Sequence, residues 1–165
     1  MTGVVAAMWV APATDQLTLA LQGFVAALLG AIVGWERGRS GKDAGLRTHA
    51  LVAAAAAIAC GLGEMVLESA QVTGDATRTM HAIITGVGFI GAGAILHSEK
   101  GTTGVTTAAS VLFVAVIGAA VGLGAPLLAG VSCVLALGVL RVLGGWKYRR
   151  QNAEYRAQLP FAHDE

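Results

Sequence analysis

Charged residues are scarce in this 165-residue chain: only 13% are Asp, Glu, Lys or Arg, and the mean hydropathy is +0.68. About a quarter of the residues in a soluble domain are charged, so this composition excludes an ordinary soluble domain. No basic stripe with interleaved aromatic residues is present, and a net charge of +1 gives no reason to expect nucleic-acid binding. The composition instead predicts a membrane protein with little mass outside the bilayer.

Cysteines and early basic residues are also few. Cys60 and Cys133 both lie inside apolar runs, which argues against a disulfide framework. No Lys or Arg precedes Arg37, so the positive n-region of a cleaved signal peptide is missing. We therefore expect free thiols packed as small apolar groups and no cleaved leader.

Uncharged runs occupy most of the chain, and a run of roughly 18 or more residues is long enough to cross a bilayer. The sequence predicts an all-α, polytopic transmembrane helix bundle of about five spans, with a four-span arrangement and a re-entrant last segment as the alternative. The expected parts are an external segment over 1–16, a transmembrane domain over 17–145 and a short cytoplasmic tail over 146–165. The spans are placed near 17–35, 47–69, 80–97, 104–123 and 125–145.

Basic residues fall almost entirely on one side of these spans. The other side holds only Arg78. The positive-inside rule therefore places the amino terminus outside and the tail in the cytoplasm. The basic side carries Arg37, Arg39, Lys42, Arg47, Lys100, Arg141, Lys147, Arg149, Arg150 and Arg156.

A shift of 59 residues reveals a weak internal repeat, which indicates a parallel repeat of helical hairpins. Low sequence complexity would produce a similar match, so both explanations stay open. In this alignment, Gly34, Gly45, Leu46, Thr48, Ala50 and Gly63 fall on Gly93, Gly104, Val105, Thr107, Ala109 and Gly122.

Small residues recur at helical spacing within the spans, and such faces let helix backbones approach in a membrane. The stretch 85–94 contains GxGxxG, but the dinucleotide fingerprint needs a soluble βαβ unit, which is not expected here. We predict that the small residues pack within the bundle or between protomers. They are Gly30, Gly34, Thr85, Gly86, Gly88, Gly91, Ala92, Gly93, Gly118 and Gly122.

Five motifs in this order resemble the MgtC/SapB membrane-protein family over roughly residues 20–125. They read GWER (34–37), AGLRTHALV (44–52), Asp75 with Arg78, TGVGFIGAGAIL (85–96) and GVTTAAS (104–110). The resemblance implies a bacterial inner-membrane protein linked to adaptation to low magnesium and, in pathogens, to virulence and survival inside host cells. It further implies a regulator that contacts other membrane proteins, including ATP synthase, and makes the label of magnesium transporter doubtful.

The chain departs from this family pattern in three places. Gly38-Arg39 stands where a second acidic residue is common, and Leu112-Phe113 replaces a Trp of the fourth span. Only about twenty residues follow Gly145, where many relatives carry a soluble domain. Functions that reside in that domain are not expected here.

Polar residues near the first basic loop are the leading functional candidates: Glu36, Arg37, Arg47, Thr48 and His49. The plainer explanation is local ion pairing, and the functional one is contact with a partner or an ion. Arg47 begins a span, where a positive charge is unfavourable, so we expect it to pair with Glu36 or another anion.

Further candidates lie at the starts of the third and fourth spans. Thr106 and Thr107 begin the fourth span, where capping by a preceding Thr102 or Thr103 is the plainer expectation. Asp75 with Arg78 is either a helix cap or part of an outer carboxylate group. That group, Asp75, Glu64 and Glu68, would bind Mg²⁺ weakly.

No enzyme and no cofactor are expected, because Ser110 and Ser132 lie in apolar helices without an evident neighbouring base. The spans also lack a central Asp, Glu or Lys, the usual mark of an ion path. The favoured function is an oligomeric, non-enzymatic regulator, and the alternative is a transporter or channel for Mg²⁺ or another small ion. A polar path through the interface between the two repeats would favour transport, whereas an ungrooved, glycine-lined outer surface would favour partner binding.

Overall fold

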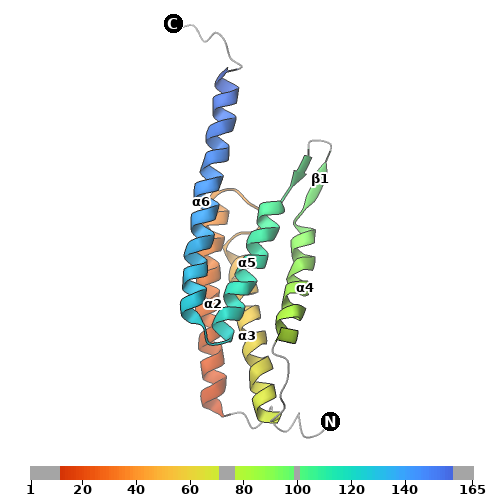
Figure 1. The fold of residues 1–165 in the computed structure, drawn as a ribbon, viewed down its shortest axis with the longest axis vertical. Coiled ribbons are helices and arrows are strands. Elements are labelled where there is room, and N and C mark those ends of the chain that lie inside the picture. The colour runs from red at the N-terminus through yellow and green to blue at the C-terminus, as the bar shows by residue number, and fades with distance from the viewer. Residues whose placement is uncertain (1–11, 71–76, 99–100, 158–165) are drawn as a thin grey trace.

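A bundle of helices makes up the computed structural model, which describes residues 12–70, 77–98 and 101–157. The helices alternate in direction, so α2 and α6 run the same way (Figure 1). The predicted all-α transmembrane bundle is confirmed. The described elements are α2 (Ala13–Arg39), α3 (Leu46–Ala70), α4 (Thr77–Gly93), β1 (Leu96–Ser98), β2 (Gly101–Thr103), α5 (Val105–Gly122) and α6 (Pro126–Ala157).

Four of these helices are long and apolar enough to cross a membrane: α2, α3, α5 and α6. The fifth, α4, has 17 residues. At 1.5 Å per residue it is roughly 26 Å long, slightly less than the ~30 Å hydrocarbon core. It nevertheless runs antiparallel to α3 and α5 beside them (Figure 1). The third expected span is therefore a helix that is shorter than the other four.

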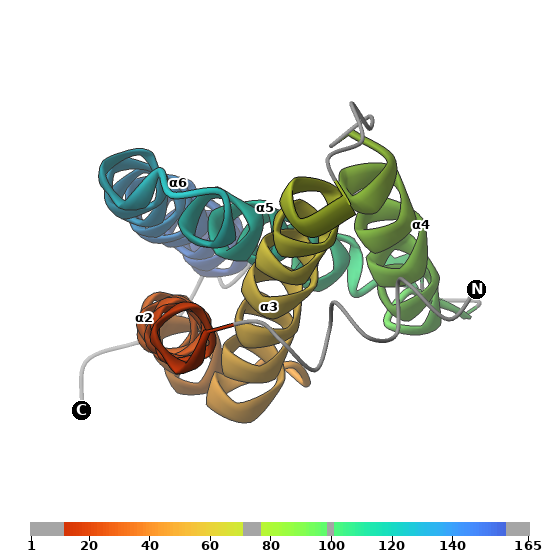
Figure 2. The ribbon, with the colours of Figure 1, turned by 90° about the horizontal axis from the view of Figure 1, so that it is seen from below.

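Helix α5 is the centre of the bundle, because it packs against each of the other four helices. Seen from below, α4 lies on the side of α5 and α3 that faces away from α2 and α6 (Figure 2). The largest core cluster joins α2, α3, α5 and α6 and is built mainly from small aliphatic side chains. Its members are Ala26, Val33, Ala53, Ala57, Val114, Ile117, Val121, Ala129 and Cys133.

Glycines bring α2, α3 and α5 into backbone contact. A Cβ at Gly118 or Gly122 would overlap the carbonyl oxygens of Ala53 and Ala57, respectively. On the other side of α3, a Cβ at Gly34 would lie 2.7 Å from the Cα of Leu46. Helix α3 is thus held between two glycine-lined faces, where lipid offers no competing gain and close van der Waals contact supplies the attraction.

The glycines of α4 behave differently from this expectation. Gly86, Gly88 and Gly93 have no atom within 4 Å of a Cβ position, and Gly91 makes only ordinary contact with Ala108. The prediction that Gly86, Gly88 and Gly93 pack within the bundle is therefore wrong. Packing between protomers remains a prediction.

The segment between α4 and α5 also differs from the prediction of a span that continues to residue 97. Helix α4 ends at Gly93, and β1 pairs antiparallel with β2. Gly104 then precedes α5 with φ +85°, close to the carbonyl of Ala94, so the capping expected from Thr102 or Thr103 is absent and both residues lie in β2. Glycine is needed here because a side chain would meet that carbonyl.

The remaining boundaries agree with the sequence to within a few residues at most ends. Helix α2 begins at Ala13 rather than near 17, and α6 begins at Pro126, a favourable first helical position, but continues to Ala157 beyond the expected end near 145. The starts of α3 and α5, Leu46 and Val105, are separated by the 59 residues of the sequence repeat.

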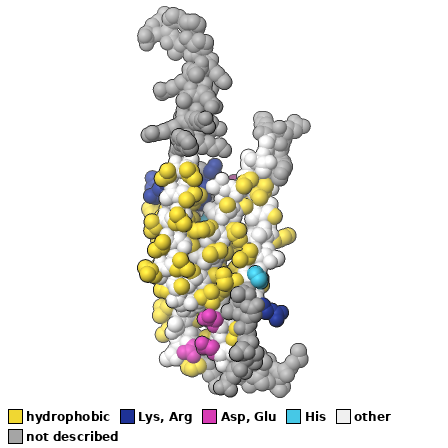
Figure 3. Space-filling view, viewed as in Figure 1, with side chains coloured by type: hydrophobic (Ala, Val, Ile, Leu, Met, Phe, Trp, Pro, Cys, Tyr) yellow, Lys and Arg dark blue, Asp and Glu magenta, His cyan; other side chains and the backbone are white. Residues whose placement is uncertain are grey.

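On the face shown in Figure 3, basic and acidic side chains lie mainly at opposite ends of the bundle. Basic side chains lie at the upper end and acidic ones at the lower end, apart from one basic patch near the lower end of α4 (Figure 3). The apolar surface between them is broad and includes Phe24, Leu51, Leu127 and Val134, all more than half exposed. This surface pattern is that of a protein whose middle faces lipid.

We predict that Gly118→Ala destabilises the bundle by about 1–3 kcal/mol, because the added methyl group forces α5 away from α3. Thermal unfolding of the purified protein in detergent, followed by tryptophan fluorescence, measures this. Gly138→Ala on α6 is the control, since nothing lies within 4 Å of its Cβ position. Equal melting temperatures for the two variants would contradict the proposed backbone contact.

Candidate functional site

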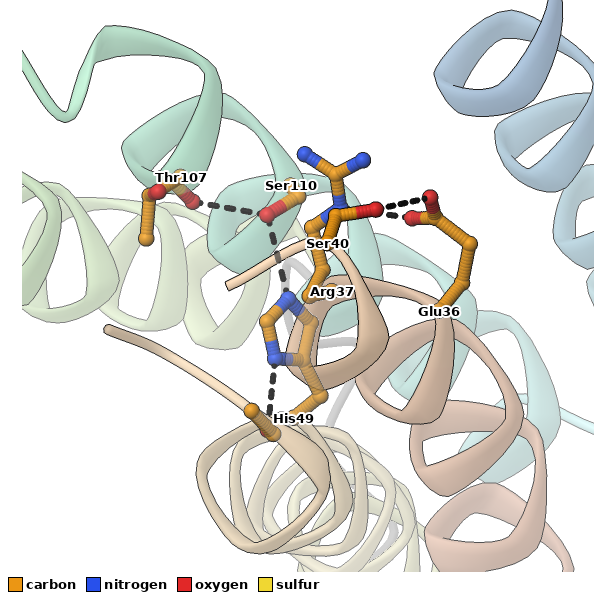
Figure 4. Close-up of polar contacts among 7 residues, drawn as sticks. Glu36, Arg37, Ser40, His49, Thr107 and Ser110 are labelled. Atoms are coloured by element: carbon orange, nitrogen blue, oxygen red, sulfur yellow. Dashed lines mark hydrogen bonds and ion pairs between the residues drawn. The ribbon is translucent and has the colours of Figure 1, made fainter. Parts of the chain in front are cut away.

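Buried polar side chains gather where the upper ends of α2, α3 and α5 meet. This polar junction comprises Glu36, Arg37, Ser40, His49, Thr107 and Ser110 (Figure 4). Five of the six are the buried polar residues of the described chain, and Ser40 bonds to one of them. The junction is the natural candidate site, because buried polar groups in a membrane protein are costly and usually functional.

The first part of the junction is an ion pair between neighbours on α2. Arg37 Nε lies 2.6 Å from Glu36 Oε2, and the two side chains are 5% and 9% exposed. The Ser40 hydroxyl donates to the other carboxylate oxygen at 2.9 Å. Glu36 therefore has both oxygens bonded and is fixed against the end of its own helix.

This pairing corrects one sequence prediction. Arg47 was expected to pair with Glu36, but the partner is Arg37, and Arg47 is exposed at the start of α3. The loop holding residues 40–45 turns α3 so that His49, rather than Arg47, faces α2 and α5. Helical periodicity decides this, because residues 47 and 49 differ by about 200° around the axis.

The second part of the junction centres on His49, whose side chain is fully buried. Its Nδ1 lies 2.9 Å from the carbonyl oxygen of Gly45, and its Nε2 lies 3.0 Å from Ser110 Oγ (Figure 4). A carbonyl oxygen only accepts, so Nδ1 carries hydrogen. The ring therefore joins the first turn of α3 to α5.

Ser110 has one hydroxyl proton and two acceptors within reach. Its Oγ is also 2.8 Å from the carbonyl oxygen of Thr107. With a neutral His49 the hydroxyl donates to Nε2; with a protonated ring both ring nitrogens donate and the hydroxyl turns to Thr107. Burial disfavours a charged ring. The orientation of the Ser110 hydroxyl is thus coupled to the protonation of His49.

The expectation that Ser110 has no neighbouring base is wrong, since His49 lies beside it. The pair still lacks the features of a nucleophilic site. Ser110 is only 7% exposed, and the far nitrogen of His49 is held by a backbone carbonyl rather than a carboxylate. In this packing the His49–Ser110 hydrogen bond joins α3 to α5.

Glycines place His49 in this position. A Cβ at Gly30 would overlap the carbonyl oxygen of His49, and one at Gly34 would lie 2.9 Å from the His49 Cβ. Helix α2 therefore allows α3 to approach closely enough for the imidazole to reach α5. The sequence indicated both features separately, the glycines as packing residues and His49 as a polar candidate.

The other predicted site residues lie outside this junction. Thr48 is half-buried and Thr106 is exposed, as is Arg78 on α4. Asp75 falls outside the described residues, so its expected roles stay predictions. Ser40 joins the site through a local bond to Glu36, four residues before it, which the sequence analysis missed. Ser110 joins it because the starts of α3 and α5, far apart in sequence, meet there.

The acidic end of the bundle holds a hollow of about 200 Å³. It is lined in part by Asp15, Thr18, Gln22, Glu64 and Glu68. Within the described ranges, however, no three His, Cys, Asp or Glu residues lie close enough together to hold a metal ion. The expected magnesium group of Asp75, Glu64 and Glu68 is untested, because Asp75 is not described.

We predict that Arg37→Gln lowers stability by about 1–3 kcal/mol, because it leaves the Glu36 carboxylate without its cation. This loss of stability should be smaller than for a fully desolvated ion pair, because the junction lies at the helix ends. Arg47→Gln is the matched control and should change stability little. Thermal unfolding in the same detergent compares them. A larger effect of the Arg47 variant would restore the pairing that the sequence suggested.

Comparison with known proteins identifies one matching family and several relatives of this chain. A model of the MgtC family matches residues 24–147. The chain is 37% identical over 139 residues to "Putative magnesium transporter YhiD" of Escherichia coli (strain K12), covering 82% of this chain and 65% of YhiD. It is 36% identical over 129 residues to Protein SrpB of Synechococcus elongatus, covering 68% of each.

Protein MgtC of Salmonella typhimurium (strain LT2) is 41% identical over 100 residues, covering 60% of this chain and 41% of MgtC. The chain thus spans slightly less than two thirds of YhiD and less than half of MgtC. No solved structure gives a significant match. The family match covers well over half of the chain and includes every residue of the polar junction, so the chain belongs to the MgtC family.

Proposed function

We propose that this chain is a non-enzymatic regulator of the bacterial inner membrane that acts through helix contacts with other membrane proteins. The observation that carries the proposal is a contrast between two parts of the bundle. The α2, α3 and α5 core is closed by backbone contacts, whereas α4 presents unpartnered glycines. The first property disfavours a conduction path, and the second favours a docking helix.

The closed core lies where a transport pathway would be needed. Gly118 and Gly122 leave no room between α5 and α3, and Gly30 leaves none between α2 and α3. The buried polar residues of the described chain all lie at or near one end of the bundle. A path for a divalent cation needs polar or charged groups across the membrane, and the middle of this core has aliphatic side chains.

The open face of α4 has the properties of a helix-docking surface. Among the described residues, no atom lies within 4 Å of a Cβ position at Gly86, Gly88 or Gly93. Phe89, which lies between Gly88 and Gly93 in the sequence, is 82% exposed. The helix lies at the edge of the bundle (Figure 2). Small residues beside a large aromatic one allow a second helix to approach closely and gain contact area. The occupant is a second copy of the chain or a partner such as ATP synthase, which the family resemblance implies.

The physiological setting follows from the relatives. The description of YhiD is "Putative magnesium transporter". The family resemblance implies adaptation to low magnesium and survival inside host cells. Transport of Mg²⁺ or another small ion is the second candidate. It is favoured by the hollow at the acidic end, which Glu64 and Glu68 line.

An assay of Mg²⁺ flux and an assay of growth in low magnesium together distinguish a regulator from a transporter. Protein reconstituted into liposomes around a Mg²⁺-sensitive dye should give no influx above that of empty liposomes. The same chain should restore growth of a strain deleted for its own family member in low magnesium. Gly88→Leu should abolish this rescue at normal abundance, because the leucine obstructs the docking face while nothing inside the chain is displaced.

Gly138→Leu on α6 is the matched control, since it also has no neighbour within 4 Å. It should support growth as the wild type does. Protein-dependent Mg²⁺ influx would overturn the proposed regulator in favour of transport. Full growth with Gly88→Leu would remove α4 as the docking element.

We also propose that the amino terminus is external and the tail cytoplasmic, supported by the basic residues at one end of the bundle (Figure 3). A cysteine replacing Lys42 in a cysteine-free background should resist a membrane-impermeant thiol reagent in intact spheroplasts. A cysteine replacing Asp15, at the opposite end, should react. The reverse pattern would invert the orientation.

A further inference from the structure

An apolar groove on the side of the bundle away from α4 has no role in the regulator function. Helices α2, α5 and α6 enclose about 200 Å³ there. The lining includes Val33 on α2, Ala109 and Phe113 on α5, and Leu135, Ala136 and Leu140 on α6. Ala109, Phe113 and Leu135 are exposed, so the groove opens onto the lipid-facing surface. Its shape and lining suit one hydrocarbon chain.

The upper end of the groove leads to the polar junction. Arg37 follows Val33 by one helical turn on α2, and Ser110 both lines the groove and bonds to His49. The Arg37 side chain is 5% exposed, and its Nε donates to Glu36. Its terminal nitrogens point away from that carboxylate and make no hydrogen bond to any described residue (Figure 4).

These terminal nitrogens are not sealed inside the protein. Within the described part of the chain, no fully buried side-chain nitrogen or oxygen lacks a hydrogen-bond partner. The terminal nitrogens of Arg37, which have no hydrogen-bond partner among the described residues, therefore retain some solvent-accessible surface, although the side chain as a whole is only 5% exposed. A planar guanidinium in this setting presents parallel N–H donors suited to two oxygens of one phosphate.

A second cation lies at the same end of the groove. Arg141 directly follows Leu140 on α6, is exposed, and lies near enough to act electrostatically on Glu36. Glu36, Arg37 and Arg141 together carry one net positive charge. One phosphate of single negative charge would balance this group without displacing any bond that the structure contains.

We propose that this groove binds one anionic phospholipid from the leaflet beside the polar junction. An acyl chain lies along Ala109, Leu135 and Leu140, and the headgroup phosphate lies between Arg37 and Arg141. The combination of an apolar groove with a cation from each of two flanking helices selects a lipid over a soluble anion. Bound lipid joins α6 to α2, two helices that pack against each other less extensively than α2 packs against α3 or α5.

Native mass spectrometry of the full chain in detergent, titrated with phosphatidylglycerol and with phosphatidylcholine of the same acyl chains, tests the proposal. Phosphatidylglycerol should bind more tightly. Arg141→Gln should weaken its binding about fivefold, because each basic residue at an anionic surface contributes about 1 kcal/mol. Ala109→Leu should weaken binding similarly by filling the groove without changing any charge.

Matched controls come from the same chain. Arg47→Gln removes an exposed cation at the same end of the bundle, and Ala82→Leu adds the same bulk on exposed α4. Both should bind phosphatidylglycerol as the wild type does. Arg37→Gln is avoided as the sole test, because it disturbs the Glu36 pair.

Two results would overturn the proposal. One is equal affinity of wild type, Arg141→Gln and Ala109→Leu for phosphatidylglycerol. The other is thermal stabilisation by inorganic phosphate, in lipid-free detergent, that equals stabilisation by phosphatidylglycerol and persists in Ala109→Leu. That second result would assign the cations to a soluble anion and leave the groove without a ligand.

Discussion

The close approach of α3 to the two helices on either side of it is the constraint on which the rest of the structure depends. Gly30 and Gly34 of α2 admit one side of α3, and Gly118 and Gly122 of α5 admit the other. In lipid there is no hydrophobic gain between helices, so contact area and polar bonds must supply the attraction. Backbone-level contact gives more of this area than larger side chains could at the same interface.

The polar junction is a consequence of that approach. His49 reaches Ser110 because the glycines of α2 let the first turns of α3 come close to α5. Its buried imidazole, the Glu36–Arg37 pair and the Ser40 hydroxyl then satisfy one another at the bundle end. In the apolar setting each of these groups would be costly alone. The same close helix packing therefore forms both the core and the candidate site.

Close packing does not extend to the outer surface of α4 or to the groove beside α6. Gly86, Gly88 and Gly93 of α4 resemble the glycines of α2 and α5 in sequence, but none of the described helices covers them. The opposite side of α5 is likewise incompletely filled, which leaves the groove near Phe113 and Leu135. One surface suits a helix and the other a lipid chain, because only the second continues into a pair of cations, Arg37 and Arg141.

The sequence alone determined the class of the fold, because uncharged runs of spanning length have few alternatives in a bilayer. It also indicated which end is basic, contained the family motifs and included His49 among several polar candidates. Tertiary structure decided the partners: Glu36 with Arg37 rather than Arg47, and His49 with Ser110. It also decided which glycines are covered. Sequence gives the periodicity along one helix, whereas contacts between helices depend on their rotation and depth, which only the assembled packing fixes.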